Sequence, residues 1–105
     1  MAQTVSLDEM HAAAGRACRL MKTLANPDRL MLLCQLAQRE MSVGELESAL
    51  GIPQPTLSQQ LTVLRGEGLV DTRRDGKYVH YRVRNGPAPA ILEALYAQFC
   101  GRKNR

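Results

Sequence analysis

The hydrophobic period of the chain changes at Gly68, and this change limits the folds that fit it. Up to Gly66, apolar residues recur every three or four positions, as in amphipathic helices. Beyond Gly68, the segments LVDTRR and KYVHYRV alternate as strands do, with Asp75 and Gly76 between them. Asp-Gly between two alternating runs is a strong hairpin signal. We therefore expect several helices followed by a β-hairpin that turns at Asp75–Gly76.

Short signals at the helix ends divide the first part of the chain. Residues 6–9 (SLDE) and 42–45 (SVGE) each place a serine three positions before a glutamate, which is the spacing of a capping box. Asn26 followed by Pro27 is typical of an N-cap and a first helical residue. Gly51 predicts the end of a short helix, and IPQPTLSQQLTVLRGEG forms the next helix after a four-residue turn. Two helices joined in this way indicate a helix-turn-helix.

The predicted elements form one small domain. The segment DRLMLLCQLAQRE is apolar on most faces and should be the buried central helix, and AILEALYAQFC should form the last helix. A chain of 105 residues suits one domain, which we expect to span 1–105, to be ordered at about 7–101 and to end in a basic tail at 102–105. The predicted fold is mainly α with a β-hairpin wing, a winged helix-turn-helix in the order ααααββα.

The first predicted helix carries an apolar stripe that suits a partner helix. The stripe consists of Met10, Ala14, Ala17, Met21 and Leu24. A domain of this size buries only a modest core, so a dimer would bury more apolar surface. We therefore expect this helix to contribute to an interface between two chains.

One face of the second helix of the helix-turn-helix is polar and carries no acid. On a helical wheel, Leu57, Leu61 and Leu64 form the core face. The opposite face is formed by Pro55, Ser58, Gln59 and Thr62. Amides donate to and accept from base edges, and hydroxyls suit phosphates or bases. A solvated polar face has the same composition, so this helix alone does not decide between the two interpretations.

Basic residues of the predicted hairpin favour nucleic acid as the partner. The net charge is +4 and the isoelectric point is near 9.3, and residues 65–84 contribute +3 of that charge. Arg73, Arg74 and Lys77 surround the predicted turn at a fixed offset from the polar helix. This combination fits a duplex with the helix in the major groove and the hairpin on the adjacent backbone or minor groove. Double-stranded DNA is the expected partner.

Other classes of function are disfavoured. No apolar run approaches 18 residues and the N-terminus does not resemble a signal peptide, so we expect no membrane contact and a cytoplasmic location. No nucleophile motif, phosphate loop or carboxylate pair stands out, so we expect neither an enzyme nor a cofactor. Three cysteines, Cys18, Cys34 and Cys100, are too few for a disulfide scaffold. His80 has no second ligand at metal-binding spacing, so we expect no metal there.

The sequence resembles the ArsR/SmtB family of dimeric winged-helix repressors over roughly residues 8–100. The resemblance rests on the segments LANPDRLMLLCQL, SVGELESALGIPQPTLSQQLTVLRGEGLV and RRDGKYVHYRV. It implies that the LSQQL helix reads an operator, that the hairpin is the wing, and that the first and last helices pack across a homodimer. By position, it implies that the residues facing the groove are Gln54, Thr56, Ser58, Gln59 and Thr62. Gln60 departs from the pattern, since many members have His there.

Within that family the metal-binding boxes are absent and two cysteines remain. The stretch ELESAL lacks the Cys-x-Cys pair of one box, and AILEALYAQFC lacks the acidic and His ligands of another. Cys34 and Cys100 stand in contexts similar to those of the BigR/SqrR branch, which includes HlyU-type regulators. That resemblance implies a repressor that senses reactive sulfur species and releases DNA when the two cysteines are linked through extra sulfur atoms.

Geometry suggests how such a pair could select sulfur donors. A disulfide requires Cα atoms within about 7 Å, and each added S–S bond extends the reach by about 2 Å. Apolar surroundings disfavour the Cys34 thiolate, whereas Arg102 and Lys103 lie near Cys100 in sequence. We therefore expect Cys100 to be the more accessible thiol, and we expect Cys18 to serve in packing.

Two alternatives stay open. One is a metal-responsive or metalloid-responsive repressor that uses Cys34 and Cys100 with His11 or Cys18 as a third ligand. The other is a winged-helix adaptor whose polar helix contacts a protein. Metal binding that a chelator reverses would indicate the first, and an absence of salt-dependent DNA affinity would indicate the second.

Overall fold

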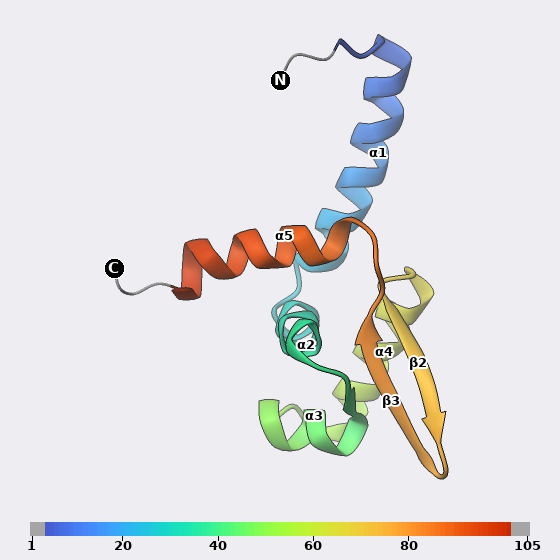
Figure 1. Ribbon diagram of the computed structural model, residues 1–105, viewed down its shortest axis with the longest axis vertical. Helices are drawn as coiled ribbons and strands as arrows, with labels where there is room; N and C mark the ends of the chain where they lie inside the picture. Colours follow the sequence, from blue (N-terminus) through green and yellow to red (C-terminus); the bar gives the residue numbers. More distant parts are fainter. Residues whose placement is uncertain (1–3, 102–105) are drawn as a thin grey trace.

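The computed structural model describes residues 4–101 and places a small sheet at one side of the helices (Figure 1). Its elements are α1 (Leu7–Leu24), α2 (Pro27–Gln38), β1 (Met41–Ser42), α3 (Val43–Leu50), α4 (Gln54–Gly66), β2 (Val70–Asp75), β3 (Tyr78–Val83), α5 (Pro87–Tyr96) and the π-helical turn η1 (Ala97–Gly101). The predicted order of helices, hairpin and last helix is confirmed. The basic tail expected at 102–105 lies outside the described residues.

The helix ends follow the local signals of the sequence. Both capping boxes are present, at the starts of α1 and α3, and the Asn26 side chain accepts from the N–H of Arg29 at the start of α2. Gly51 ends α3 with φ 70°, a left-handed conformation that glycine adopts at low cost. Three residues, 51–53, connect α3 to α4, so the turn is one residue shorter than expected.

The core lies around α2, which contacts α1, α3, α4, α5 and β3. Leu32 and Leu33 of α2 have no exposed surface. The predicted core face of α4 is confirmed, because Leu57, Leu61 and Leu64 are all buried. The opposite face of α4 is thereby turned away from the domain.

The hairpin turns one residue later than the sequence indicated. Asp75 still pairs with Tyr78, so the two-residue loop is Gly76–Lys77 instead of Asp75–Gly76. Gly76 has φ 66°, which suits a tight turn with glycine at the first loop position. A third strand, β1, pairs with the other side of β3 and completes a sheet in the order β1-β3-β2. With two residues, β1 is too short to give a periodic signal.

The last helix begins earlier than predicted and ends differently. The segment NGPAP was expected to precede the helix, yet α5 begins at Pro87, with Gly86 as its N-cap. Proline is tolerated in the first turn, where its missing N–H has no helical partner. The end of the helix widens into η1, which contains Cys100. Among the described residues, no helix is long and apolar enough to cross a bilayer.

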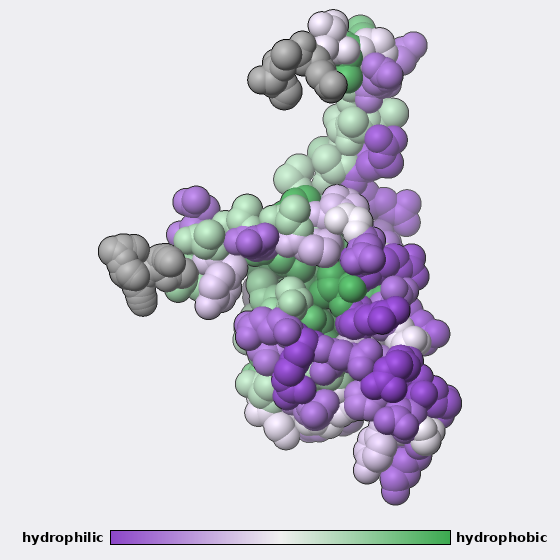
Figure 2. All heavy atoms as spheres, in the orientation of Figure 1, coloured by the Kyte–Doolittle hydropathy of each residue, from purple (hydrophilic) through white to green (hydrophobic). Residues whose placement is uncertain are grey.

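Helix α1 leads away from the rest of the domain (Figure 1). Only Thr23 and Leu24 at its end are buried, whereas Met10 and Met21 of the apolar stripe are 50% and 56% exposed. Figure 2 shows apolar atoms along one side of this helix. Cys18 is exposed as well, so its expected packing role is not met within the described chain.

Candidate functional site

Helix α4 presents most of its polar side chains to solvent. Gln54, Ser58, Gln59 and Thr62 are exposed, while Thr56, which was also expected to face the groove, is half-buried. Ser58 donates to Gln54 Oε1 at 2.9 Å, and Thr62 donates to the Ser58 carbonyl at 2.9 Å. The first turn of α4 contains no acidic residue. This surface therefore offers neutral donors and acceptors without a charge that would repel phosphate.

Gln60 faces inward and not toward the exposed side of α4. It is half-buried, and its Oε1 accepts from Arg29 Nη1 of α2 at 3.0 Å. Arg29 Nε also donates to the carbonyl of Thr23, in the last turn of α1, at 2.7 Å. Sequence reasoning noted Gln60 only as a departure from the family pattern. The contact with Arg29 was missed, since the two residues are 31 positions apart.

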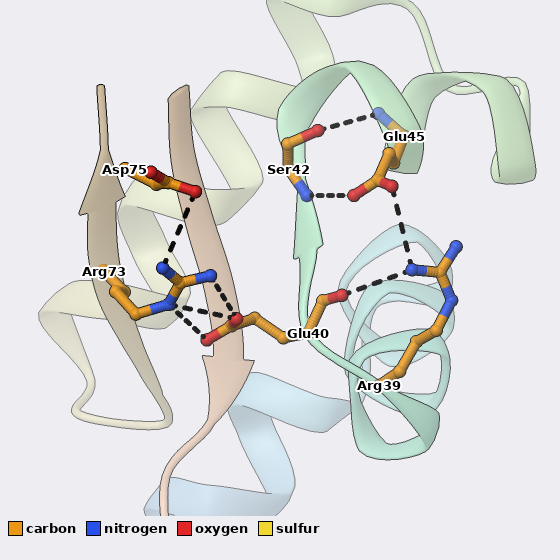
Figure 3. A network of polar contacts seen from close by, with 6 residues as sticks. All are labelled: Arg39, Glu40, Ser42, Glu45, Arg73 and Asp75. Carbon is orange, nitrogen blue, oxygen red and sulfur yellow. Dashed lines mark hydrogen bonds and ion pairs between the residues drawn. The ribbon is translucent and has the colours of Figure 1, made fainter. Parts of the chain in front are cut away.

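Arg73 of the wing is held by carboxylates. Its Nη2 lies 2.7 Å from Glu40 Oε1, its Nε donates to the same oxygen at 3.1 Å, and its Nη1 lies 3.9 Å from Asp75 Oδ2 (Figure 3). Glu40 precedes β1, so the pair joins the two outer strands of the sheet across β3. The same bond is the main reason why the pKa of Glu40 is lowered.

A second cluster continues this network toward α3. Arg39 Nη1 lies 3.7 Å from Glu45 Oε2 and donates to the carbonyl of Glu40 at 3.4 Å (Figure 3). Glu45 Oε1 in turn accepts from the N–H of Ser42 at 2.8 Å, which is the main cause of the lowered pKa of Glu45. The ends of α2, β1, α3 and the wing are thus tied together at one edge of the sheet.

Arg74 and Lys77, the other two wing residues that were expected to contact DNA, are exposed. Side chains alternate between the two faces of a strand, so Arg74 shares a face with Val70 and Arg73 lies on the other. Val70 is buried in the core with the leucines of α4. Arg74 therefore lies on the sheet face turned toward the helices, beyond the core, and Lys77 lies in the turn at the tip.

Cys34 lines a groove between α2 and α5. The groove has a volume of about 410 Å³ and is largely apolar, with Ala37 of α2 and Leu92 and Tyr96 of α5 among its walls. Cys34 itself is half-buried. Burial raises the pKa of its thiol, and the negative charge of a Cys100 thiolate raises this pKa further. The Cys34 thiol is therefore mostly protonated near neutral pH.

Cys100 lies in η1 and is exposed, and Cys18, Cys34 and Cys100 are all free thiols. Helix α5 packs against α2, and Tyr96 at the end of α5 lines the same groove as Cys34, so the fold brings the start of η1 close to α2. Between residues 4 and 101, no three His, Cys, Asp or Glu side chains gather closely enough to hold a metal ion. His11 and Cys18, considered as third ligands, both lie exposed on α1.

Similar proteins show which family this chain belongs to. A family model described as bacterial regulatory protein, arsR family, matches residues 26–72. The biofilm growth-associated repressor of Agrobacterium fabrum is 56% identical over 96 residues, covering 91% of this chain and 82% of the relative. The chain belongs to the ArsR family.

Solved structures of similar proteins agree with the fold. The transcriptional repressor BigR from Xylella fastidiosa superposes with a TM-score of 0.83 at 49% identity, covering 90% of this chain and 94% of BigR. Reduced HlyU from Vibrio cholerae superposes with a TM-score of 0.86 at 41% identity, covering 90% of this chain and all of HlyU. The predicted resemblance and the winged helix-turn-helix fold are confirmed. The protein is a transcriptional regulator and not an enzyme.

Proposed function

We propose that the protein is a dimeric repressor that binds operator DNA and releases it when reactive sulfur species link Cys34 to Cys100. Helix α4 enters the major groove with Gln54, Ser58, Gln59 and Thr62, and the wing lies on the neighbouring backbone or minor groove. The similar proteins from Agrobacterium and Xylella are named repressors, which supports the sign of the regulation. A cytoplasmic location belongs to the same proposal.

The exposed apolar surfaces support a homodimer. The stripe of α1 is exposed from Met10 to Met21, and Tyr96 and Phe99 at the other end of the described chain are 51% and 82% exposed. Exposed apolar surface on this scale is typical of protein interfaces. A twofold dimer through α1 and the last helix would present two α4 helices to half-sites about 34 Å apart.

The observation that carries the sulfur proposal is the placement of the two thiols. Cys34 lies half-buried in an apolar groove whose wall includes Tyr96, and the exposed Cys100 follows Tyr96 by four residues. A bridge with two inserted sulfur atoms spans more distance than a disulfide, since each S–S bond adds about 2 Å. The longer bridge would tie the last helix to the central helix and change the distance between the two α4 helices of the dimer.

The chemistry balances with persulfide as the only oxidant. The Cys100 thiolate attacks the outer sulfur of a persulfide, R–S–SH; the S–S bond of the donor breaks and R–SH leaves. Two further transfers build a chain of three added sulfur atoms on Cys100. The Cys34 thiolate then attacks the penultimate sulfur and expels hydrosulfide. In total, two protein thiols and three persulfides yield one tetrasulfide bridge, three thiols and one hydrogen sulfide.

The order of attack follows from exposure and charge. Cys100 is exposed and meets the donor first, whereas the raised pKa of Cys34 leaves little of that thiol as the reactive thiolate. The Cys34 thiolate then takes the penultimate sulfur of the chain on Cys100, and the terminal sulfur leaves as hydrosulfide. Cys34 thus acts as the resolving thiol.

Intact-mass analysis and DNA binding on one sample test the proposal. The reduced protein is treated with cysteine persulfide, and its affinity is measured for a duplex that it selects from a random pool. A gain of two sulfur atoms less two hydrogens, mapped to Cys34 and Cys100, with weaker DNA binding, is the expected result. Cys34→Ser and Cys100→Ser should bind DNA and fail to respond, and Cys18→Ser should respond as the unmodified protein does.

Other outcomes point to the alternatives. An unchanged mass, together with a loss of DNA affinity on adding a thiophilic metal that a chelator reverses, would support the metal-responsive repressor. A protein that selects no duplex and shows no salt-dependent affinity would support the adaptor. Peroxide provides a further control, since ready formation of a plain Cys34–Cys100 disulfide would contradict the selection by bridge length.

A further inference from the structure

Arg29 is the one described residue whose side chain bonds to two other helices at once. It lies on α2, its Nε donates to the Thr23 carbonyl of α1 at 2.7 Å, and its Nη1 donates to Gln60 Oε1 of α4 at 3.0 Å. Its own N–H donates to Asn26 Oδ1 at 3.0 Å, which fixes the first turn of α2. The acceptor residue Thr23 is 7% exposed. This junction therefore joins the proposed interface helix, the central helix and the reading helix.

Arg29 and Cys34 lie on different sides of the same helix. Five residues correspond to a rotation of about 140° at 3.6 residues per turn. One side of α2 therefore holds α4 through Arg29, while the other side lines the groove against α5 through Cys34. A helix of this length moves as a rigid body, because its backbone hydrogen bonds and the packed core around it resist local deformation. A displacement at Cys34 is therefore carried to Arg29.

The neighbours of Gln60 make α4 responsive to that displacement. Gln59, the next residue, is on the exposed face proposed to read DNA, and Leu61 on the other side is buried in the core. A pull on Gln60 would rotate or shift the reading face about the leucines that anchor the helix. The hydrogen bond joins a charged donor to a half-buried amide, a class stronger than bonds between neutral groups.

Another link between α1 and α4 is less suited to this task. Arg19 Nε lies 2.8 Å from Glu67 Oε1, but the Arg19 side chain is 74% exposed. Exposed ion pairs contribute little and are weakened by salt. Glu67 also follows the last turn of α4, far along the helix from the exposed residues at its start. The half-buried contact near the centre of α4 is the better candidate.

We infer that Arg29 is a positioning residue that couples the state of the cysteine pair to the orientation of the reading helix through its hydrogen bond to Gln60. This inference rests on the proposed sulfur switch. Bridging Cys34 to Cys100 draws α2 toward the end of the last helix, and Arg29 then releases Gln60 or moves it. In either case, the polar face of α4 leaves the geometry that fits the duplex.

The test separates coupling from affinity. The affinity for the selected duplex is measured for the protein and for its Gln60→Met variant, each in the reduced form and after treatment with cysteine persulfide. The quantity compared is the ratio of the Kd of the treated form to the Kd of the reduced form. Methionine keeps the length of glutamine and removes the acceptor. We expect the ratio to fall at least about fivefold in Gln60→Met, since allosteric factors typically lie at about 5–150. Intact mass should show the same tetrasulfide in both proteins.

Gln59→Met is the matched control. Its side chain lies on the exposed face, so the substitution should weaken binding of the reduced and the bridged protein by the same factor and leave the ratio unchanged. Arg29→Lys is a second variant for the case in which Gln60→Met fails to fold. It keeps the charge but lacks the planar fork that serves Thr23 and Gln60 together, and its ratio should fall as well.

The outcomes distinguish this inference from the function on which it rests. The unmodified protein could lose affinity on bridging while a folded Gln60→Met variant shows the same ratio. That result would overturn the role of Arg29 and leave the sulfur switch standing. A shift of both affinities by one common factor would assign Gln60 a structural role only. A protein that forms no bridge with persulfide would overturn both.

Discussion

Arg73 and Glu40 form an ion pair in which Nη2 lies 2.7 Å from Oε1, and this pair fastens the wing to the strand that follows α2. The two residues are 33 positions apart. Arg73 was expected to contact DNA, and its side chain is half exposed, but its charge is paired with Glu40 at the protein surface. Arg74, its neighbour in sequence, lies on the opposite face of the sheet and stays exposed. The two arginines should therefore contribute differently to DNA binding.

Salt dependence distinguishes the two arginines. Arg74→Gln should lower the slope of log Kd against log salt by about 1, as expected for the loss of one phosphate contact. Arg73→Gln should change the slope less, because the Arg73 charge is already paired with Glu40. Fluorescence anisotropy over a range of salt concentrations measures both slopes, with Lys77→Gln as a second variant at the tip. Equal slopes for the two arginine variants would contradict this division.

The same ion pair predicts a pH dependence of stability. The bond from Arg73 lowers the pKa of Glu40 below its ordinary value of 4.5. A carboxyl whose pKa is lower in the folded state stabilises the fold above pH 4.5, and this contribution is lost as the pH falls through the folded-state pKa. Thermal unfolding between pH 6 and 3 should therefore show a steeper loss of Tm for the unmodified protein than for Glu40→Gln.

Arg73→Gln provides the partner measurement. It should flatten the pH profile of Tm as Glu40→Gln does, and the double variant should add little, because either substitution removes the same interaction. Profiles for Glu40→Gln that run parallel to those of the unmodified protein would show that Glu40 does not take part in the acid response.

Cys34 should react slowly with alkylating agents near neutral pH. Its pKa is raised above 9.0, mainly by burial and further by the Cys100 thiolate, and only the thiolate is alkylated. Iodoacetamide rates at Cys34, followed by peptide mass mapping, should rise with pH to a midpoint above 9.0. In Cys100→Ser the midpoint should fall but stay above 9.0, since burial remains. A midpoint that Cys100→Ser leaves unchanged would show that the charge of Cys100 does not affect the pKa of Cys34.

Substitution in the apolar stripe of α1 tests the proposed dimer. Met21→Lys places a charge where two chains are proposed to meet. Losing the burial of a methionine costs about 1.5–3 kcal/mol, and twofold symmetry doubles this cost. The dissociation constant of the dimer should therefore rise by about a hundredfold or more. Sedimentation equilibrium measures the change. Ala12→Lys, on the opposite face of α1, should leave association unchanged, and equal effects of both variants would argue against this interface.

Signals within four or five residues determined most of the secondary structure. Both capping boxes, the Asn26 cap and the Gly51 stop were readable because each involves groups near in sequence, and the leucine face of α4 followed from its period. The hairpin was predicted, but its turn was misplaced by one residue, because cross-strand pairing with Tyr78 decides the register. The start of α5 was missed because a first helical turn tolerates prolines that would break a helix interior.

The sequence by itself therefore determined the fold class, the polar face of α4 and the identity of the cysteines. Only the tertiary structure decided which of these groups meet. Arg29 reaches Gln60, Arg73 reaches Glu40, and the end of α5 reaches the groove lined by Cys34 only after α2 is packed at the centre of the domain. Such contacts join residues far apart in the chain, and their geometry is set by how the helices pack on one another, which no local pattern encodes.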